Sequence, residues 1–146
     1  LEPGEAVGWQ TGVLTSTVED IVESKGIKIA MLNISFSCHL PDCLEMPYKP
    51  AVLGAKEPDK NSKFVYRLGG CSYLAGDYMG MGDFDFDEPL EIGDRIIFDD
   101  MIHYTMVKTT FFNGVKHPAI GFVDKNGEFH LLSEPGSYKA YKEKLG

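Results

Sequence analysis

The chain is poor in cysteine, in basic residues and in long apolar runs. Its 146 residues include three cysteines, one tryptophan, and 14 Lys and Arg against 22 Asp and Glu, for a net charge of −8. Nucleic-acid binding requires clustered Lys and Arg, so this balance argues against a nucleic-acid partner and suits a cationic ligand better. No apolar run approaches the roughly 20 residues of a membrane span, and the first residues lack the basic and apolar regions of a signal peptide. These absences predict a cytoplasmic protein without a membrane segment.

The three cysteines, Cys38, Cys43 and Cys71, are odd in number and lack the spacing of a disulfide framework. Free thiols in a reducing compartment are therefore expected. Cys38, His39 and Cys43 together suggest zinc, but their spacing is at the long limit for a ligand pair and no second pair follows. The sequence predicts no metal site.

Short runs of β-branched and aromatic residues, separated by turn signals, predict one mainly β domain. Gly and Pro supply the turn signals, and three prolines exclude a long regular element from Cys38 to Pro50, which is expected to be an ordered loop. The segment 76–82 is expected to be a flexible or tightly turned loop. The expected elements are strands at 13–21, 27–35, 64–68 and 95–98, a hairpin over 119–129 and a helix over 137–145.

One run of residues resembles a known family. Gly93-Asp94, Met101, Tyr104-Thr105 and Phe112-Asn-Gly114 match the G-D-x-x-x-F-x-x-M-x-x-Y-T and F-N-G blocks of the fold-type III pyridoxal phosphate decarboxylases, the alanine racemase and ornithine decarboxylase group. The resemblance implies that the Tyr104 hydroxyl binds the cofactor phosphate; without it, a half-buried packing tyrosine is the simpler interpretation. It also implies a C-terminal β-barrel or sandwich-like domain over residues 1–146, whose partner (β/α)₈ barrel, with the Schiff-base lysine, lies outside this chain.

The first residues extend the resemblance. Glu2-Pro-Gly4 is similar to a family block in which the glutamate pairs with the pyridine nitrogen and keeps the ring an electron sink. In the same block the glycine amide faces the phosphate, so Glu2 and Gly4 are cofactor-binding candidates. Residues 1–10 would then be the end of the barrel domain. Taken alone, the triplet reads as an exposed turn, and Glu5 stands where the family usually has arginine.

Gly69 to Asp77 resembles the family's C-x-x-x-D element, in which a cysteine crosses a homodimer interface and helps reprotonate the substrate carbon. Four residues before Asp77 stands Tyr73, and Cys71 lies two residues earlier. Cys71, Tyr73 and Asp77 are thus the catalytic candidates. The alternatives are that Tyr73 replaces the cysteine, that a local shift brings Cys71 into place, or that this protein is altered at the position. A further interpretation makes Cys71 a small buried residue.

The segment Ser35 to Tyr48 resembles one branch of the family, the carboxynorspermidine (carboxyspermidine) decarboxylases. The implied reaction is decarboxylation to norspermidine or spermidine in polyamine biosynthesis, by a homodimer with shared sites, and the piece alone should be inactive. Asp42 and Glu45 would take the substrate ammonium groups, with His39 as a further substrate-binding candidate. Surface carboxylates are the plainer interpretation. The alternatives are a diaminopimelate or ornithine decarboxylase-like enzyme, or a non-catalytic regulatory homologue.

Overall fold

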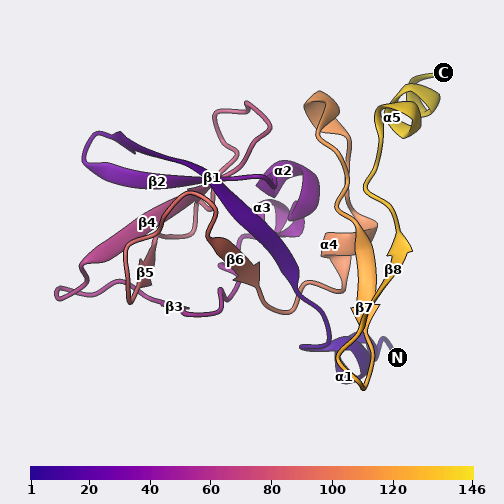
Figure 1. Cartoon of the computed structure of the whole chain (residues 1–146), viewed down its shortest axis with the longest axis horizontal. Helices are drawn as coiled ribbons and strands as arrows, with labels where there is room; N and C mark the ends of the chain where they lie inside the picture. Colours follow the sequence, from indigo (N-terminus) through magenta and orange to yellow (C-terminus); the bar gives the residue numbers. More distant parts are fainter.

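The computed structural model describes all 146 residues, and the chain is mainly β as predicted. A six-stranded sheet has the order β3-β5-β4-β2-β1-β6, and a separate hairpin joins β7 to β8 (Figure 1). The strands are β1 Leu14–Ser24, β2 Ile27–Leu32, β3 Ala55–Lys56, β4 Phe64–Gly69, β5 Phe84–Phe86, β6 Arg95–Phe98, β7 Ile120–Val123 and β8 Phe129–Ser133. The helices are α1 Gly4–Gly8, α2 Phe36–His39, α3 Asp42–Glu45, α4 Tyr104–Val107 and α5 Tyr138–Leu145, with a 3₁₀ turn, η1, at Phe112–Gly114.

The first hairpin forms where the sequence predicts it. Ser24 pairs with Ile27, and the two residues between them have positive φ angles, 53° at Lys25 and 78° at Gly26. Two-residue turns of this kind match the twist of the flanking strands. The predicted strands that became β4 and β6, the β7–β8 hairpin and the terminal helix α5 are likewise confirmed, with bounds shifted by a few residues at most. Ser137 caps α5 by accepting a hydrogen bond from the Ala140 amide.

The larger sheet curls until its two ends meet. The first part of β1 pairs with β6 and its second part with β2, and the register shifts between Val18 and Asp20, where a bulge lets the strand bend. On the other side of β6, the Leu53 amide donates to Ile97 O at 2.9 Å and the Asp99 amide donates to the oxygen of residue 51 at 2.9 Å. Residues 51–53 lead directly into β3, so the sheet closes into a small barrel.

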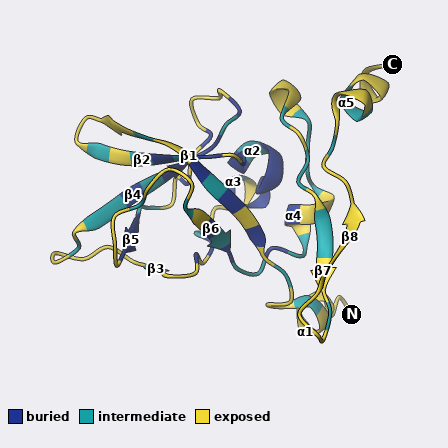
Figure 2. Cartoon of the chain, in the orientation of Figure 1, coloured by how far each residue is buried: buried dark blue, intermediate teal, exposed yellow.

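The barrel interior is filled by one cluster of 17 buried apolar residues. Phe36 from α2 and Phe98 from β6 are fully buried, and their rings meet edge to face with centroids 5.9 Å apart. Leu40 and Cys43 also belong to this cluster, so the α2–α3 segment packs on the barrel core. Figure 2 shows the buried residues gathered where β1, β2, β4 and α2 come together.

The prediction of a loop from Cys38 to Pro50 was wrong in part, because the segment contains the end of α2 and all of α3. Ser35 caps α2 by accepting a hydrogen bond from the Cys38 amide at 3.0 Å. Pro41 precedes α3, where a missing amide donor costs nothing. Each helix is a single turn, too short to leave an apolar period in the sequence.

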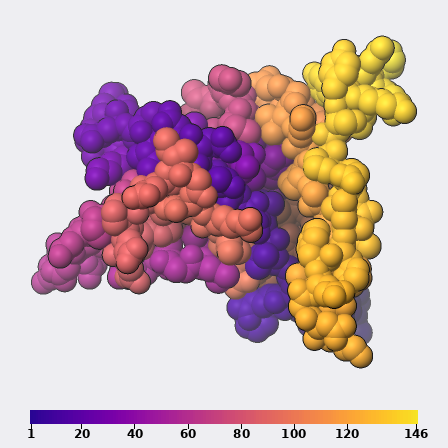
Figure 3. Space-filling model, in the orientation of Figure 1, coloured from indigo at the N-terminus to yellow at the C-terminus, as the bar shows by residue number.

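The β7–β8 hairpin and α5 stand beside the barrel, and the hairpin turn lies close to α1 in the view of Figure 1. All five residues of β8 are exposed, including three large apolar ones, Phe129, Leu131 and Leu132. The space-filling view shows α5 projecting from the end of this arm (Figure 3). The longest helix, α5, has eight residues, and none of the helices has the length and apolar character that a membrane crossing requires.

Candidate functional site

The structure brings the C-x-x-x-D-like segment and the F-N-G block together. Cys71 and Tyr73 line one side of an open hollow of about 330 Å³, and Asn113 and Gly114 of the F-N-G block line another. The Asn113 side-chain amide donates to Ser72 O at 2.7 Å, which ties the two segments to each other. Two of the family blocks therefore meet at one place, although 41 residues separate this bonded pair along the chain.

The two candidates for the cysteine position differ in setting. Tyr73 is 99% exposed and has a positive φ of 63°, which is strained for a residue other than glycine. Cys71 is half-buried, and burial, with the nearby charge of Asp77, raises the pKa of its thiol. Its amide donates to Ile34 O at 2.9 Å. At neutral pH the Cys71 sulfur is therefore mainly a thiol, and Tyr73 is the more accessible side chain.

Asp77, the third catalytic candidate, faces inward. It is 4% exposed, and its Oδ1 accepts hydrogen bonds from the Ser35 hydroxyl at 3.1 Å and the Ser37 amide at 2.9 Å. Its Oδ2 accepts from both the amide and the hydroxyl of Ser72, at 3.0 and 2.6 Å. With both oxygens engaged inside the chain, this geometry gives Asp77 no contact with a molecule outside the loop.

Asp42 lies in the first turn of α3 and is only 5% exposed. Its Oδ2 accepts a hydrogen bond from the Tyr48 hydroxyl at 2.6 Å, whereas its Oδ1 is buried and has no partner in the chain. Burial and the bond to Asp42 raise the pKa of Tyr48, which therefore stays a donor. Burial also raises the pKa of the adjacent Cys43 thiol to about 11. Asp42 thus keeps one buried acceptor without a donor, which is uncommon in folded proteins.

Glu45 ends α3 and forms an ion pair with Lys108, which follows α4. The Lys108 Nζ also lies 5.8 Å from the centre of the Tyr104 ring. The bond to Glu45 raises the pKa of Lys108. Tyr104, 56% exposed at the start of α4, is thereby placed on the same side of the barrel as α3. Lys108 therefore contacts both Glu45, a candidate ammonium-binding residue, and Tyr104, the candidate phosphate-binding residue.

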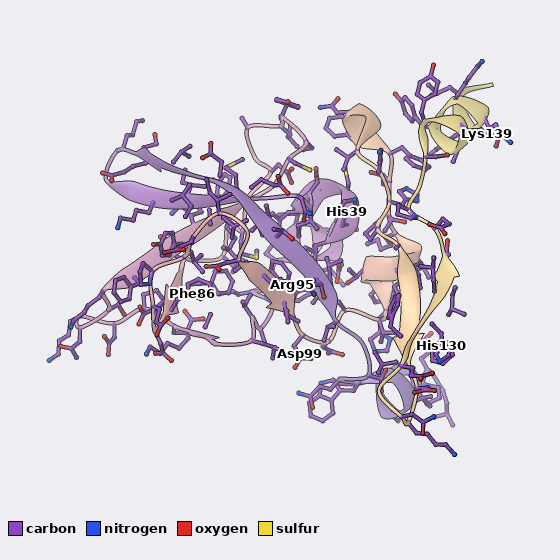
Figure 4. The ribbon with its side chains drawn as sticks, in the orientation of Figure 1. His39, Phe86, Arg95, Asp99, His130 and Lys139 are labelled. Atoms are coloured by element: carbon purple, nitrogen blue, oxygen red, sulfur yellow. The ribbon has the colours of Figure 1, made fainter.

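His39 is buried at the end of α2, and Figure 4 shows it between the barrel and the segment that follows α4. Its Nδ1 accepts a hydrogen bond from the Ser35 amide at 3.2 Å, and its Nε2 bonds the oxygen of Lys116 at 2.9 Å. Because an amide only donates and a carbonyl only accepts, the ring is neutral with its proton on Nε2. Burial lowers the pKa of His39. Both nitrogens are engaged, so the geometry does not support a substrate contact by His39.

The first residues of the chain lie along the segment that precedes Tyr104. The Gln10 amide donates to Asp100 Oδ1 at 2.8 Å, and a Cβ on Gly8 would lie 2.6 Å from the ring of His103. Gly4 opens α1 with no atom within 4 Å of the space its side chain would fill, and Glu2 is exposed. These contacts bring the elements that carry Gly4 and Tyr104 to one place.

The chemistry of this place fits the phosphate end of pyridoxal phosphate. Tyr104 has an exposed phenol hydroxyl, and the backbone amide of Gly4 lies at the start of α1 with open space around the residue. Both groups are donors of the kind that bind phosphate oxygens. The Glu2 carboxylate is of the right type for a protonated pyridine nitrogen. None of the family blocks found in this chain contains the lysine that forms the Schiff base.

His117 and His130 both stand beside turn signals in the sequence, which predicts that they face solvent, and the structure separates them. His130 is exposed and bonds Asp124 at 3.2 Å (labelled in Figure 4), as predicted. His117 is not: its ring stacks on Phe111 with centroids 3.7 Å apart, and its Nε2 is buried without a partner. Burial lowers the pKa of His117. The prediction for His117 was wrong because the aromatic partner comes from a turn that the sequence pattern does not place nearby.

Three residues that bond the candidate site segments were not among the residues predicted from the sequence: Lys108, Tyr48 and Asn113. Tyr48 ends the Ser35–Tyr48 segment, Asn113 stands in the F-N-G block, and Lys108 lies between the Tyr104-Thr105 and F-N-G matches. Residue type was the available signal for Lys108 and Tyr48: a cation and a hydrogen-bond donor. Of the residues weighed and set aside as zinc ligands, Cys38 donates weakly to Phe112 O at 3.6 Å, and both His39 nitrogens are engaged as described. The three cysteines are free thiols.

No protein-family model matches the chain. A carboxyaminopropylagmatine decarboxylase from Synechocystis sp. is 58% identical over 146 residues, which are 100% of this chain and 37% of the relative. A carboxynorspermidine/carboxyspermidine decarboxylase from Campylobacter jejuni is 45% identical over 151 residues, covering 97% of this chain and 38% of the relative. The chain thus spans less than half the length of these relatives.

Solved structures agree with the sequence matches. A Campylobacter jejuni carboxynorspermidine decarboxylase complexed with norspermidine superimposes with a TM-score of 0.89 at 43% identity, over 96% of this chain and 40% of that one. A diaminopimelate decarboxylase from M. jannaschi, at 23% identity and a TM-score of 0.76 over 92% of this chain and 30% of that one, shows the shared fold alone. These matches confirm the resemblance: over nearly its whole length the chain is similar to the C-terminal part of carboxynorspermidine and carboxyaminopropylagmatine decarboxylases.

Proposed function

We propose that this chain supplies the β-domain side of the active site of a pyridoxal-phosphate-dependent decarboxylase that acts on carboxynorspermidine or carboxyspermidine. The observation that carries the proposal is the acidic corner at α3, where Asp42 holds a buried oxygen without a donor and Glu45 already pairs with an ammonium group. A substrate ammonium would supply the same kind of partner. Each hydrogen bond of this charged type contributes about 1.5–3 kcal/mol.

Cofactor binding is assigned to the neighbouring elements. Tyr104 donates its hydroxyl and Gly4 its amide to the phosphate, and Glu2 holds the proton on the ring nitrogen. When bound, pyridoxal phosphate withdraws the electrons left on the substrate carbon after CO₂ departs. The loop that carries Cys71, Tyr73 and Asp77 serves the reacting carbon across the interface of a homodimer, and Asp77 acts within the loop, where both its oxygens are engaged. The upstream barrel completes the site in the same protein, whose free thiols suit the cytoplasm.

A second candidate substrate is favoured by one finding, the 58% identity to a carboxyaminopropylagmatine decarboxylase. An agmatine-type substrate ends in a guanidinium group, which binds carboxylates in pairs of parallel hydrogen bonds. Asp42 and Glu45 lie three residues apart, a spacing that places two side chains on one helix face. The corner therefore suits either cationic end. Diaminopimelate, which ends in a carboxylate, is disfavoured by the same charges.

The test is CO₂ release by the full-length protein from five substrates: carboxynorspermidine, carboxyspermidine, carboxyaminopropylagmatine, diaminopimelate and ornithine. Glu45→Gln should raise KM for the active substrate about tenfold with a smaller change in kcat, because one charged contact is weakened. Glu57→Gln is the matched control. Glu57 also pairs with a lysine, Lys49, at 2.8 Å, but both residues lie outside α3. Turnover of diaminopimelate or ornithine alone contradicts the proposal.

A further inference from the structure

The loop between β4 and β5 is closed at its neck and open at its tip. The Gly70 amide donates to Asp77 O at 2.7 Å, and the Met79 amide donates to Leu68 O at 3.0 Å, so the two sides of the loop are bonded like a hairpin. Residues 71–76 then project from the barrel (Figure 1). We name residues 71–76 the tip. Its shape depends on what holds the neck.

The Asp77 carboxylate holds the tip from inside. Its four hydrogen bonds come from the segment around α2, through Ser35 and Ser37, and from the tip itself, through Ser72. The carboxylate lies against Gly70, where any Cβ would collide with it. A buried carboxylate with every bond made to the chain fixes its neighbours strongly, because losing it leaves the amides of Ser37 and Ser72 without an acceptor.

We call the four hydrogen bonds of Asp77 the clamp, and the conformation of Tyr73 shows its effect. Its left-handed backbone is strained, and such strain persists only where the surroundings determine the conformation. Ser72, immediately before it, has its amide and hydroxyl bonded to Asp77 and its carbonyl bonded to the Asn113 side chain. The next residue is therefore directed outward with its ring fully exposed. An aromatic side chain in the open on a rigid support is suited to contact another molecule.

We propose that Asp77 is a positioning residue that fixes the tip so that Tyr73, rather than Cys71, presents its side chain to the substrate. This inference rests on the proposed decarboxylase function. It gives Asp77 a role that needs no contact with substrate, in keeping with its inward carboxylate. It also resolves the choice between Cys71 and Tyr73 from their settings: Tyr73 projects from the tip, and Cys71 lies half-buried at its base with its amide bonded to Ile34.

The experiment combines amide hydrogen exchange with kinetics on the full-length protein. Asp77→Asn should speed exchange of the Ser72 amide about tenfold or more and lower kcat about tenfold, with a smaller change in KM. Tyr73→Phe should lower kcat to a similar degree and leave that exchange unaltered. The double variant should be no slower than the slower single variant, since both changes act through one side chain. Ser72→Ala removes the 2.6 Å hydroxyl bond to Asp77 and the 3.3 Å bond to the Ser37 hydroxyl but keeps the amide bond to Asp77, so it provides a milder version if Asp77→Asn does not fold.

Asp85→Asn is the matched control. Asp85 is also 4% exposed and accepts a hydrogen bond from a serine hydroxyl, that of Ser62 at 2.8 Å, but it lies on β5 away from the tip. It should change neither the exchange of Ser72 nor kcat. Unaltered exchange in both Asp77→Asn and Ser72→Ala refutes the clamp. A larger loss of kcat in Cys71→Ser than in Tyr73→Phe refutes the assignment of Tyr73. If the wild type decarboxylates none of the substrates, the proposed function fails, and exchange alone still decides the clamp.

Discussion

Protonation of His39 should loosen the contact between α2 and the segment that carries Lys116. The neutral ring bridges the two by accepting from the Ser35 amide and donating to Lys116 O. A proton added to Nδ1 would turn that acceptor into a second donor facing the Ser35 amide. Because Ser35 is fully buried, water cannot replace the lost acceptor.

The sign of the pH effect follows from the direction of the shift. Burial lowers the pKa of His39 below its ordinary value of 6.5, so the unfolded or opened chain binds a proton more readily than the closed one. The contribution of His39 to stability is therefore complete above pH 6.5 and is lost as the pH falls from there through the lower pKa of the closed form. The pKa of His117 is lowered too, by burial and by Lys144, so it adds a slope of the same sign.

The assay is native-state exchange of the Thr110 amide, which donates to Cys38 O at 3.0 Å across this contact. Its opening free energy, corrected for intrinsic exchange, should be smaller at about pH 5.5 than at about pH 8. Substituting His39→Leu removes the partners of the Ser35 amide and the Lys116 carbonyl; the buried Ser35 amide alone costs about 1–3 kcal/mol, so the contact should be destabilised at both pH values.

Two further variants separate the histidines. His39→Gln should remove most of the pH dependence at Thr110, and His117→Gln should leave the His39 part in place. The Val18 amide, bonded to Asp94 O at 2.9 Å in the barrel, is the internal control and should show no such slope. An equal slope in the wild type and His39→Gln, or greater protection at the lower pH, refutes the reasoning.

Three other changes test the fold and the site. Phe98→Ala should lower the free energy of unfolding by about 3–5 kcal/mol because the ring is fully buried in the core, whereas Phe112→Ala, at a half-exposed ring, should cost far less; urea denaturation compares them. Gly70→Ala should destabilise the chain by about 1–3 kcal/mol through its collision with the Asp77 carboxylate, again read from urea midpoints. Tyr104→Phe should weaken retention of pyridoxal phosphate about tenfold or more in equilibrium dialysis of the full-length protein, and unchanged retention would count against the phosphate assignment.

The strands were predictable because their signals are local. The Lys25-Gly26 turn, the alternation along β4 and the turn before β8 each lie within one short window of sequence. Barrel closure was not predictable in this way. It depends on residues 51–53 meeting β6 more than 40 positions later, through a segment that has no strand pattern of its own.

The candidate site was also predictable only in part. The blocks that contain Tyr104, Asp42 and Tyr73 could be found from their resemblance to the family, yet the direction in which each side chain points could not. Asp77 occupies a catalytic-looking position in sequence, and only the fold reveals that both its oxygens are used by serines from two segments. Such inward bonding is a tertiary property, since the partners lie as far as 42 residues apart. A carboxylate in a functional block is therefore better assigned a role after its hydrogen bonds are counted, and the four bonds of Asp77 within the chain support the positioning role that we propose for it.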